Sequence, residues 1–229
     1  MPGITQHTVF KLMYTSTVKV ELFSDGVIAI IITIMVLELK LPEFDVMHNA
    51  ASIEHHLLKL LPHFGAYIFS FVMVGILWFN HHHMFNLLER TDNFMLAQNL
   101  FFLFWMSLIP FVTGIVGANP LLPISIACYG LIMVMTTLTL SFMRAHSLNK
   151  GLVHKDEDQD FETKIEKVTV KDKIRSFVGS AAYVASIPLA FVSVYVSYAC
   201  FLIPIVLFLW PSTKEDAKLS EKVIEKNTI

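Results

Sequence analysis

The sequence predicts an all-α membrane protein with six transmembrane helices, and two observations carry this prediction. The first is composition: of the 229 residues, 55% are hydrophobic and only 16% are charged, and the mean hydropathy is +0.60. Soluble domains carry about 25% charged residues. The second is that the apolar residues gather into long runs, and a helix that crosses a bilayer needs about 20 mostly apolar residues.

The first three predicted helices lie between residues 20 and 116. The first covers about Val20–Leu39. The second covers about Leu61–Phe79 and begins at Pro62, a position in the first turn where a missing N–H costs nothing. The third covers about Phe94–Val116 and contains Pro110, where we expect a kink because proline interrupts the helical hydrogen bonds.

The last three predicted helices follow a Gly-Ala-Asn-Pro turn. The fourth covers about Leu121–Met143. The fifth and sixth share one apolar stretch that Pro188 divides unevenly, and we place them at about Ile174–Phe191 and Ser193–Trp210. We expect one six-helix domain over residues 1–229, with an arm at 1–19, a transmembrane region at 20–210 and a tail at 211–229.

The distribution of Lys and Arg predicts the orientation in the membrane. If both termini are cytoplasmic, fifteen of the seventeen Lys and Arg residues lie on the inside, and only Lys40 and Lys59 lie outside. Cytoplasmic loops carry an excess of these residues. The sequence therefore predicts a multi-pass protein of the cell membrane with a cytoplasmic arm and tail. Nucleic-acid-binding domains are usually strongly basic, so the net charge of −2 argues against nucleic acid as a partner.

The first helix opens with the motif Phe23-Ser24-Asp25-Gly26. A charge inside a membrane helix is costly unless it meets a partner or a water-filled cavity. The longer pattern Phe-Ser-Asp-Gly-Val-x-Ala-Ile-x-x-Thr-x-x-Val-Leu resembles the first helix of the transmembrane protein 175 family of potassium channels, in its short prokaryotic form. That family usually has arginine four residues before the phenylalanine. This chain has Lys19 there, which keeps the charge but lacks the bidentate fork of arginine.

The resemblance implies a homotetramer in which the first helix of each protomer lines a central pore. Helical spacing places Ile30, Thr33, Ile34 and Leu37 in one stripe. By resemblance, Ile30 is the main constriction, Ile34 and Leu37 line the wall, and Thr33 adds hydroxyls that help to select potassium. Without the motif, such a stripe would more often pack against lipid or another helix, and Thr33 could simply bond back to a backbone carbonyl.

Asp25 lies about 140° around the helix from Ile30, so we expect it inside the protomer rather than in the pore. The second helix ends with Trp-Phe-Asn-His-His-His, which is similar to a Trp-x-x-His pattern of the family. We expect Asp25 to accept hydrogen bonds from Trp78, Asn80 or His81 and to brace the helices rather than coordinate ions. The full set expected to brace this corner is Lys19, Phe23, Ser24, Asp25, Trp78, Asn80 and His81.

The histidines raise the question of a metal site. Consecutive residues of a helix point in different directions, so His81, His82 and His83 cannot easily share one ion. His55 and His56 are weak candidates for zinc. The His-Glu-x-x-His motif of metalloproteases does not occur. We expect no cofactor, and only permeant potassium ions as small partners.

The leading functional prediction is therefore a homotetrameric, passive cation channel in the lipid bilayer that prefers potassium weakly to moderately. A secondary ion transporter is the alternative. Transporters usually show internal repeats and helices broken near mid-membrane, and no repeat is visible here. An enzyme is not expected, because the predicted spans contain no nucleophile–base motif and no paired catalytic acids.

Overall fold

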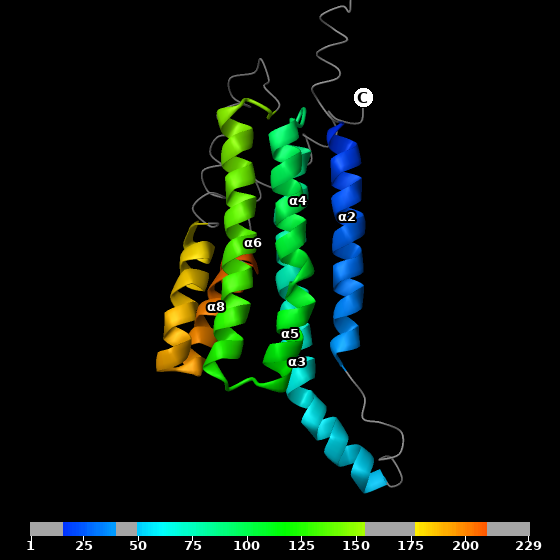
Figure 1. The fold of residues 1–229 in the computed structure, drawn as a ribbon, viewed down its shortest axis with the longest axis vertical. Helices are drawn as coiled ribbons and strands as arrows, with labels where there is room; N and C mark the ends of the chain where they lie inside the picture. The colour runs from blue at the N-terminus through cyan, green and yellow to red at the C-terminus, as the bar shows by residue number, and fades with distance from the viewer. Residues whose placement is uncertain (1–15, 40–49, 154–176, 210–229) are drawn as a thin grey trace, which may run out of the picture.

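The computed structural model describes residues 16–39, 50–153 and 177–209, and Figure 1 shows them as a bundle of helices. Apart from short turns between the helices, the described part is helical, and Leu88 forms an isolated bridge with Val153. Its elements are α2 (Thr17–Ile34), the 3₁₀ helix η1 (Met35–Glu38), α3 (Ala50–Asn86), α4 (Asn93–Ser107), α5 (Ile109–Ala118), α6 (Pro123–Asn149), the helical segment Phe177–Val192, and α8 (Val194–Leu209).

Within the described residues, six helical runs occur in the predicted order if α2–η1 and α4–α5 are each counted as one run. Four of them are long and apolar enough to cross a membrane: Thr17–Glu38, Leu58–Asn86, Asn93–Ala118 and Pro123–Asn149. The described parts of the last two, Phe177–Val192 and Val194–Leu207, are shorter apolar helices. The all-helical architecture that the composition predicts is confirmed.

The second helix is longer than the sequence indicated at both ends. It begins at Ala50 instead of about Leu61 and ends at Asn86 instead of Phe79, so Pro62 lies inside α3 and does not start it. Proline in a helix interior removes one hydrogen bond, but membrane helices tolerate it because neighbouring groups satisfy the freed carbonyl. The first turns of α3 (cyan) extend past the end of the other helices in Figure 1.

The expected break in the third helix is confirmed. α4 ends at Ser107 and α5 begins at Ile109, with Leu108 between them. The cause is Pro110, whose nitrogen carries no hydrogen for the carbonyl four residues earlier. The boundary between the fifth and sixth helices also lies within one residue of its predicted place, at Ser193, whose N–H donates to the carbonyl of Leu189 at 2.8 Å.

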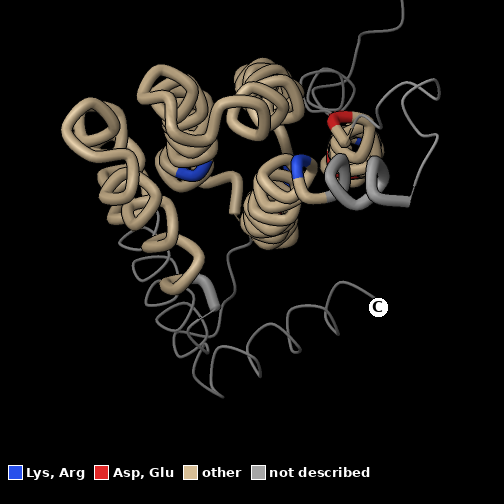
Figure 2. The backbone as a smooth tube through the Cα atoms, turned by 90° about the horizontal axis from the view of Figure 1, so that it is seen from below, with Lys and Arg blue, Asp and Glu red and all other residues tan. Residues whose placement is uncertain are grey.

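The helices are arranged so that α2 (blue) stands at the edge of the bundle in Figure 1. α2 packs against α3, α4 and α5, while α6 packs against α4 and α5, and α8 packs against α3 and α6. The beginning of α2, the α3–α4 turn and the end of α6 lie at the same end of the bundle. There the N–H of Glu89 donates to the carbonyl of Leu152 at 2.9 Å. Seen along the bundle, nearly all of the described backbone belongs to uncharged residues (Figure 2).

Candidate functional site

α2 has two faces that differ sharply in their contacts. The buried face packs into the protomer and consists of Val20, Ser24, Ile28, Ile31 and Met35. The opposite face carries the predicted stripe, and its bulky side chains are uncovered: Ile30 is 57% exposed, Ile34 45% and Leu37 67%. Phe23 continues this face and is 55% exposed. A contiguous apolar face of this kind is an interaction surface for lipid or for another protein chain.

Thr33 lies on the exposed face, and its hydroxyl bonds back to its own helix. Thr33 Oγ1 lies 2.9 Å from the carbonyl oxygen of Ile30 and 3.0 Å from that of Ala29. This is the local bond expected of threonine in a membrane helix. The hydroxyl proton is engaged in this bond, and the oxygen lone pairs remain available as acceptors.

Ser24 belongs to a buried chain of hydrogen bonds that joins three helices. The hydroxyl of Ser24 donates to the carbonyl of Val20 at 2.8 Å and accepts from Asn99 Nδ2, in α4, at 2.8 Å. Asn99 Oδ1 can therefore only accept, so His81 Nε2, 2.8 Å away in α3, carries a proton and donates to it. Ser24, His81 and Asn99 have no measurable exposure. Since every buried polar group prefers a partner, this chain fixes α2 against α3 and α4.

The ring of His81 is also held by aromatic stacking. Phe85 lies 4.4 Å from it between ring centroids, with an interplanar angle of 28°. Phe102, from α4, lies at 5.2 Å and 8°. The imidazole thus stacks on one ring of its own helix and on one ring of α4, and its Nε2–H is aimed at Asn99.

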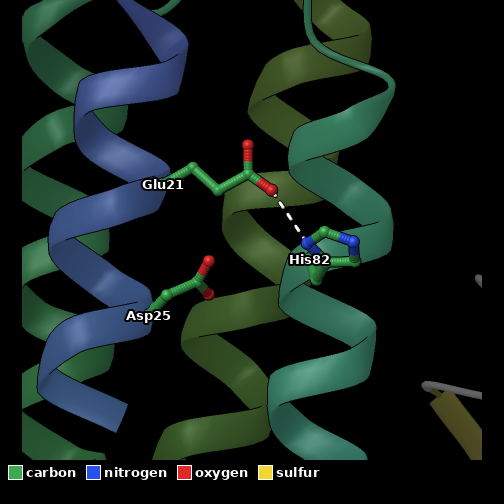
Figure 3. A group of neighbouring side chains, drawn as sticks. All are labelled: Glu21, Asp25 and His82. Carbon is green, nitrogen blue, oxygen red and sulfur yellow. Dashed lines mark ion pairs between the residues drawn. The ribbon is translucent and has the colours of Figure 1, made fainter. Parts of the chain in front are cut away.

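Asp25 and Glu21 point from α2 toward α3, as Figure 3 shows. Trp78 Nε1–H donates to Asp25 Oδ1 at 2.9 Å, so Trp78 is the partner among the three that the sequence suggested. Glu21 Oε1 lies 2.8 Å from His82 Nδ1. The rings of Trp78 and His82 are stacked, with centroids 5.6 Å apart and an interplanar angle of 18°. The four side chains form one partly buried cluster, the α2–α3 polar cluster.

Other residues that the sequence suggested do not join this cluster. Asn80 does not reach Asp25, because its amide donates to the carbonyl of Ile76 at 3.0 Å, one turn earlier in its own helix. Lys19 is exposed at the beginning of α2. The side chains of His55 and His56 lie outside the described residues.

Sequence reasoning missed two contacts of this site, the one made by Asn99 and the one between Glu21 and His82. Asn99 was missed although an amide in the middle of a predicted membrane helix is itself a signal of an interhelical bond. The approach of His82 to Glu21 was missed because the register between α2 and α3 cannot be read from one helix. Glu38 stands near the outer end of the stripe, and its carboxylate lies against Gly114 of α5, so it packs onto a neighbouring helix.

A second polar arrangement caps α4 at Asp92, which lies just before the span Asn93–Ala118. Asp92 is the N-cap residue, and its Oδ1 accepts from the N–H of Met95 at 2.7 Å. His146 Nε2, from the end of α6, lies 2.9 Å from Asp92 Oδ2. Partial burial alone would raise the pKa of Asp92, but the bonds from Met95 and His146 more than offset it. The pKa of Asp92 therefore lies below its ordinary value.

Comparison with known proteins places these features in a family. Residues 19–110 match the family model described as the endosomal/lysosomal potassium channel TMEM175. A protein of Chryseobacterium sp. (strain P1-3) named as a potassium channel is 34% identical over 203 residues, which are 89% of this chain and 97% of that protein. A second potassium channel, from Streptomyces collinus, is 31% identical over 180 residues, covering 76% of this chain and 82% of the relative.

A solved structure agrees with the same assignment. The crystal structure of a lysosomal potassium-selective channel TMEM175 homologue from Chamaesiphon minutus superposes with a TM-score of 0.71 at 26% sequence identity. The superposition covers 84% of this chain and 96% of that chain. The similarity therefore extends over most of the chain and is not limited to the Phe-Ser-Asp motif.

Proposed function

Because the chain belongs to the TMEM175 family, we propose that it is a potassium channel whose ion pathway is lined by α2. The family model and both full-length relatives bear the name of a potassium channel. The chain is accordingly a multi-pass membrane protein and not an enzyme. A secondary transporter is not favoured, since the relatives that match most of the chain are named as channels.

The observation that carries the pore assignment is the uncovered stripe of α2. Ile30 and Leu37 are more than half exposed, although the opposite face of the same helix is fully buried. Four copies placed around an axis with this face inward would bury the stripe and enclose a pathway. Ile30 would form its narrowest ring, with Ile34 and Leu37 further out and Thr33 contributing an oxygen ring next to it.

A ring of isoleucine side chains hinders an ion because the ion must give up part of its water shell to pass. A ring of bulky apolar side chains offers no oxygen ligands to a passing ion and can close by dewetting. The chain has no Thr-Val-Gly-Tyr-Gly loop, so the dense carbonyl coordination of the usual potassium filter has no counterpart in the sequence. Potassium is less strongly hydrated than sodium, and we therefore propose weak to moderate selectivity for potassium.

The polar contacts on the buried side of α2 determine which way the stripe with Ile30 faces. Ser24 and Asp25 bond to α4 and α3 from the side of α2 that faces away from Ile30. They thereby fix the rotation of α2 about its own axis. A small rotation would move Ile30 out of the narrowest ring, so these residues act as positioning residues for the pore. The proposed setting is the cell membrane, with both termini cytoplasmic.

The experiment that tests this function is the reversal potential of the purified protein in planar bilayers, with potassium on one side and sodium on the other. The expected result is a shift toward the potassium equilibrium potential. In Ile30→Ala the shift should shrink or the conductance should rise, because the ring is wider. Leu131→Ala is the matched control, since Leu131 is 50% exposed on α6. Absence of current together with saturable flux in liposomes would favour the transporter.

A further inference from the structure

The α2–α3 polar cluster contains a set of metal-donor atoms. Glu21, Asp25 and His82 each offer one ligand atom, and these atoms all lie within 4.8 Å of one another. Figure 3 shows the two carboxylates reaching from α2 toward the imidazole of α3. We propose that Glu21, Asp25 and His82 bind a divalent transition-metal ion of the Zn²⁺ class, which clamps α2 to α3.

The donor chemistry suits this class of ion. Zinc binds carboxylate oxygen and imidazole nitrogen at about 2.0–2.2 Å, usually with four ligands in a tetrahedron. Tetrahedral ligands at that bond length lie about 3.4 Å from one another. Glu21 Oε1 and His82 Nδ1 are 2.8 Å apart, so they would move about 0.6 Å further apart to hold the ion. The donor oxygen of Asp25 lies within 4.8 Å of both atoms. By closing in on the ion it would complete a three-residue set, with water in the fourth position.

Electrostatics favour a cation at this point. Glu21 and Asp25 are one helical turn apart on α2, where two negative charges repel each other. Both lie in a helix long and apolar enough to cross a membrane, where an uncompensated carboxylate is costly. A divalent ion between them would compensate both charges at once, whereas the single imidazole of His82 can compensate at most one.

The neighbouring residues hold the donors in place. Trp78 bonds only Oδ1 of Asp25, which leaves Oδ2 for an ion. His82 Nε2 lies 3.0 Å from the side-chain amide of Asn86. With a metal on Nδ1, the proton of the neutral imidazole lies on Nε2. If the Asn86 amide is turned by 180°, its oxygen accepts a hydrogen bond from this Nε2–H. Such outer hydrogen bonds orient most metal-binding histidines. Trp78 stacks on the same ring.

The site can be tested on the full-length protein in detergent, after removal of any histidine tag, by titration calorimetry with ZnCl₂. The test does not require ion conduction, so it stands apart from the proposed channel function. We expect one Zn²⁺ per protomer. Both His82→Gln and Glu21→Gln should weaken Zn²⁺ binding by at least about tenfold, because each removes a ligand. Co²⁺ should give visible absorption bands that these two variants lose.

Two controls separate this site from the other histidines. The double variant His55→Gln/His56→Gln should leave the affinity unchanged, and so should Glu38→Gln, which removes a carboxylate at the far end of the same helical run. Size-exclusion profiles check that each variant is folded. If His82→Gln does not fold, the zinc affinity of Glu21→Gln alone tests the proposal. The proposal is overturned if wild-type protein shows no saturable binding, if both ligand variants bind as wild type, or if only the His55/His56 variant loses zinc.

Discussion

At the scale of single residues, each polar group on the inner side of α2 has a partner on another helix. Ser24 is bonded to Asn99, and Asp25 is bonded to Trp78. In hydrocarbon a polar group without a partner is costly. The pairs therefore specify one register and one rotation for α2. The exposed stripe of the same helix is a consequence of this rotation.

Replacing Asn99 should test this network. In Asn99→Ala, the proton on His81 Nε2 loses its acceptor while remaining buried between Phe85 and Phe102. An unsatisfied buried donor costs about 1–3 kcal/mol. Thermal unfolding in detergent should show that loss, while Asn149→Ala, at an exposed position, should stay within about 0.5 kcal/mol of wild type. Equal stability of the two variants would mean that the network contributes nothing.

Part of this site could be predicted from the sequence and part could not. Asp25 was expected inside the protomer because it lies about 140° from Ile30 on a helical wheel, and the contact with Trp78 agrees with that placement. The bond to Asn99 and the pairing of Glu21 with His82 depend on how α2 is shifted along α3 and α4. That shift is set by the packing between helices. The periodicity of a single helix carries no information about it.

At the scale of elements, helices α3 and α5 pack closely where Gly117 of α5 faces His63 of α3. A Cβ atom added at Gly117 would lie 2.9 Å from Cδ2 and 3.0 Å from the backbone Cα of His63. Small residues at such crossings let membrane helices approach closely. Since backbone cannot rotate away as a side chain can, the two helices would have to separate.

Gly117→Ala should therefore destabilise the protein by about 1–3 kcal/mol, the usual cost of overpacking. The matched variant is Gly75→Ala, because a Cβ at Gly75 meets nothing within 4 Å and alanine favours a helix by up to about 1 kcal/mol. Midpoints of thermal unfolding should move in opposite directions for the two variants. A neutral Gly117→Ala would show that α3 and α5 are not in tight contact.

The cap of α4 should make stability depend on pH. The pKa of Asp92 in the folded protein lies below its ordinary value of 3.8, so the ionised group stabilises the fold above about pH 4. This contribution is lost as the pH falls through the lower, folded-state pKa. Asp92→Asn keeps an acceptor at the N-cap but cannot titrate. Thermal midpoints measured between about pH 5 and pH 3 should fall more steeply for wild type than for Asp92→Asn.

The elements show which sequence signals are reliable. The break at Pro110 was predictable because proline removes a backbone donor. The boundary at Ser193 was predicted to within one residue, but Pro188 is not its cause, because the helical segment Phe177–Val192 continues through that proline. The same rule failed at Pro62, where the helix continues from Ala50 to Asn86. Proline permits both a first turn and a kinked interior, and only the surrounding packing decides between them.

At the scale of the whole molecule, the composition and the spacing of apolar runs were sufficient for the all-helical membrane architecture. The arrangement of protomers was not readable in this way, since one chain with one motif carries no direct record of its stoichiometry. The proposed tetramer rests on the family resemblance and on the exposed stripe of α2. In a tetramer with α2 at its centre, cysteines placed at Leu37 in neighbouring protomers should be close enough to cross-link.

The central claim is that the exposed stripe of α2 lines the ion pathway, and cysteine modification tests it most directly. Cys128 and Cys200, both free thiols, are first replaced by alanine. Ile30→Cys is then treated with a charged methanethiosulfonate reagent during potassium current recording, with Leu131→Cys as the control. Current through Ile30→Cys should be blocked or strongly reduced, while the control should be unaffected. An undiminished current through fully labelled Ile30→Cys protein would contradict it.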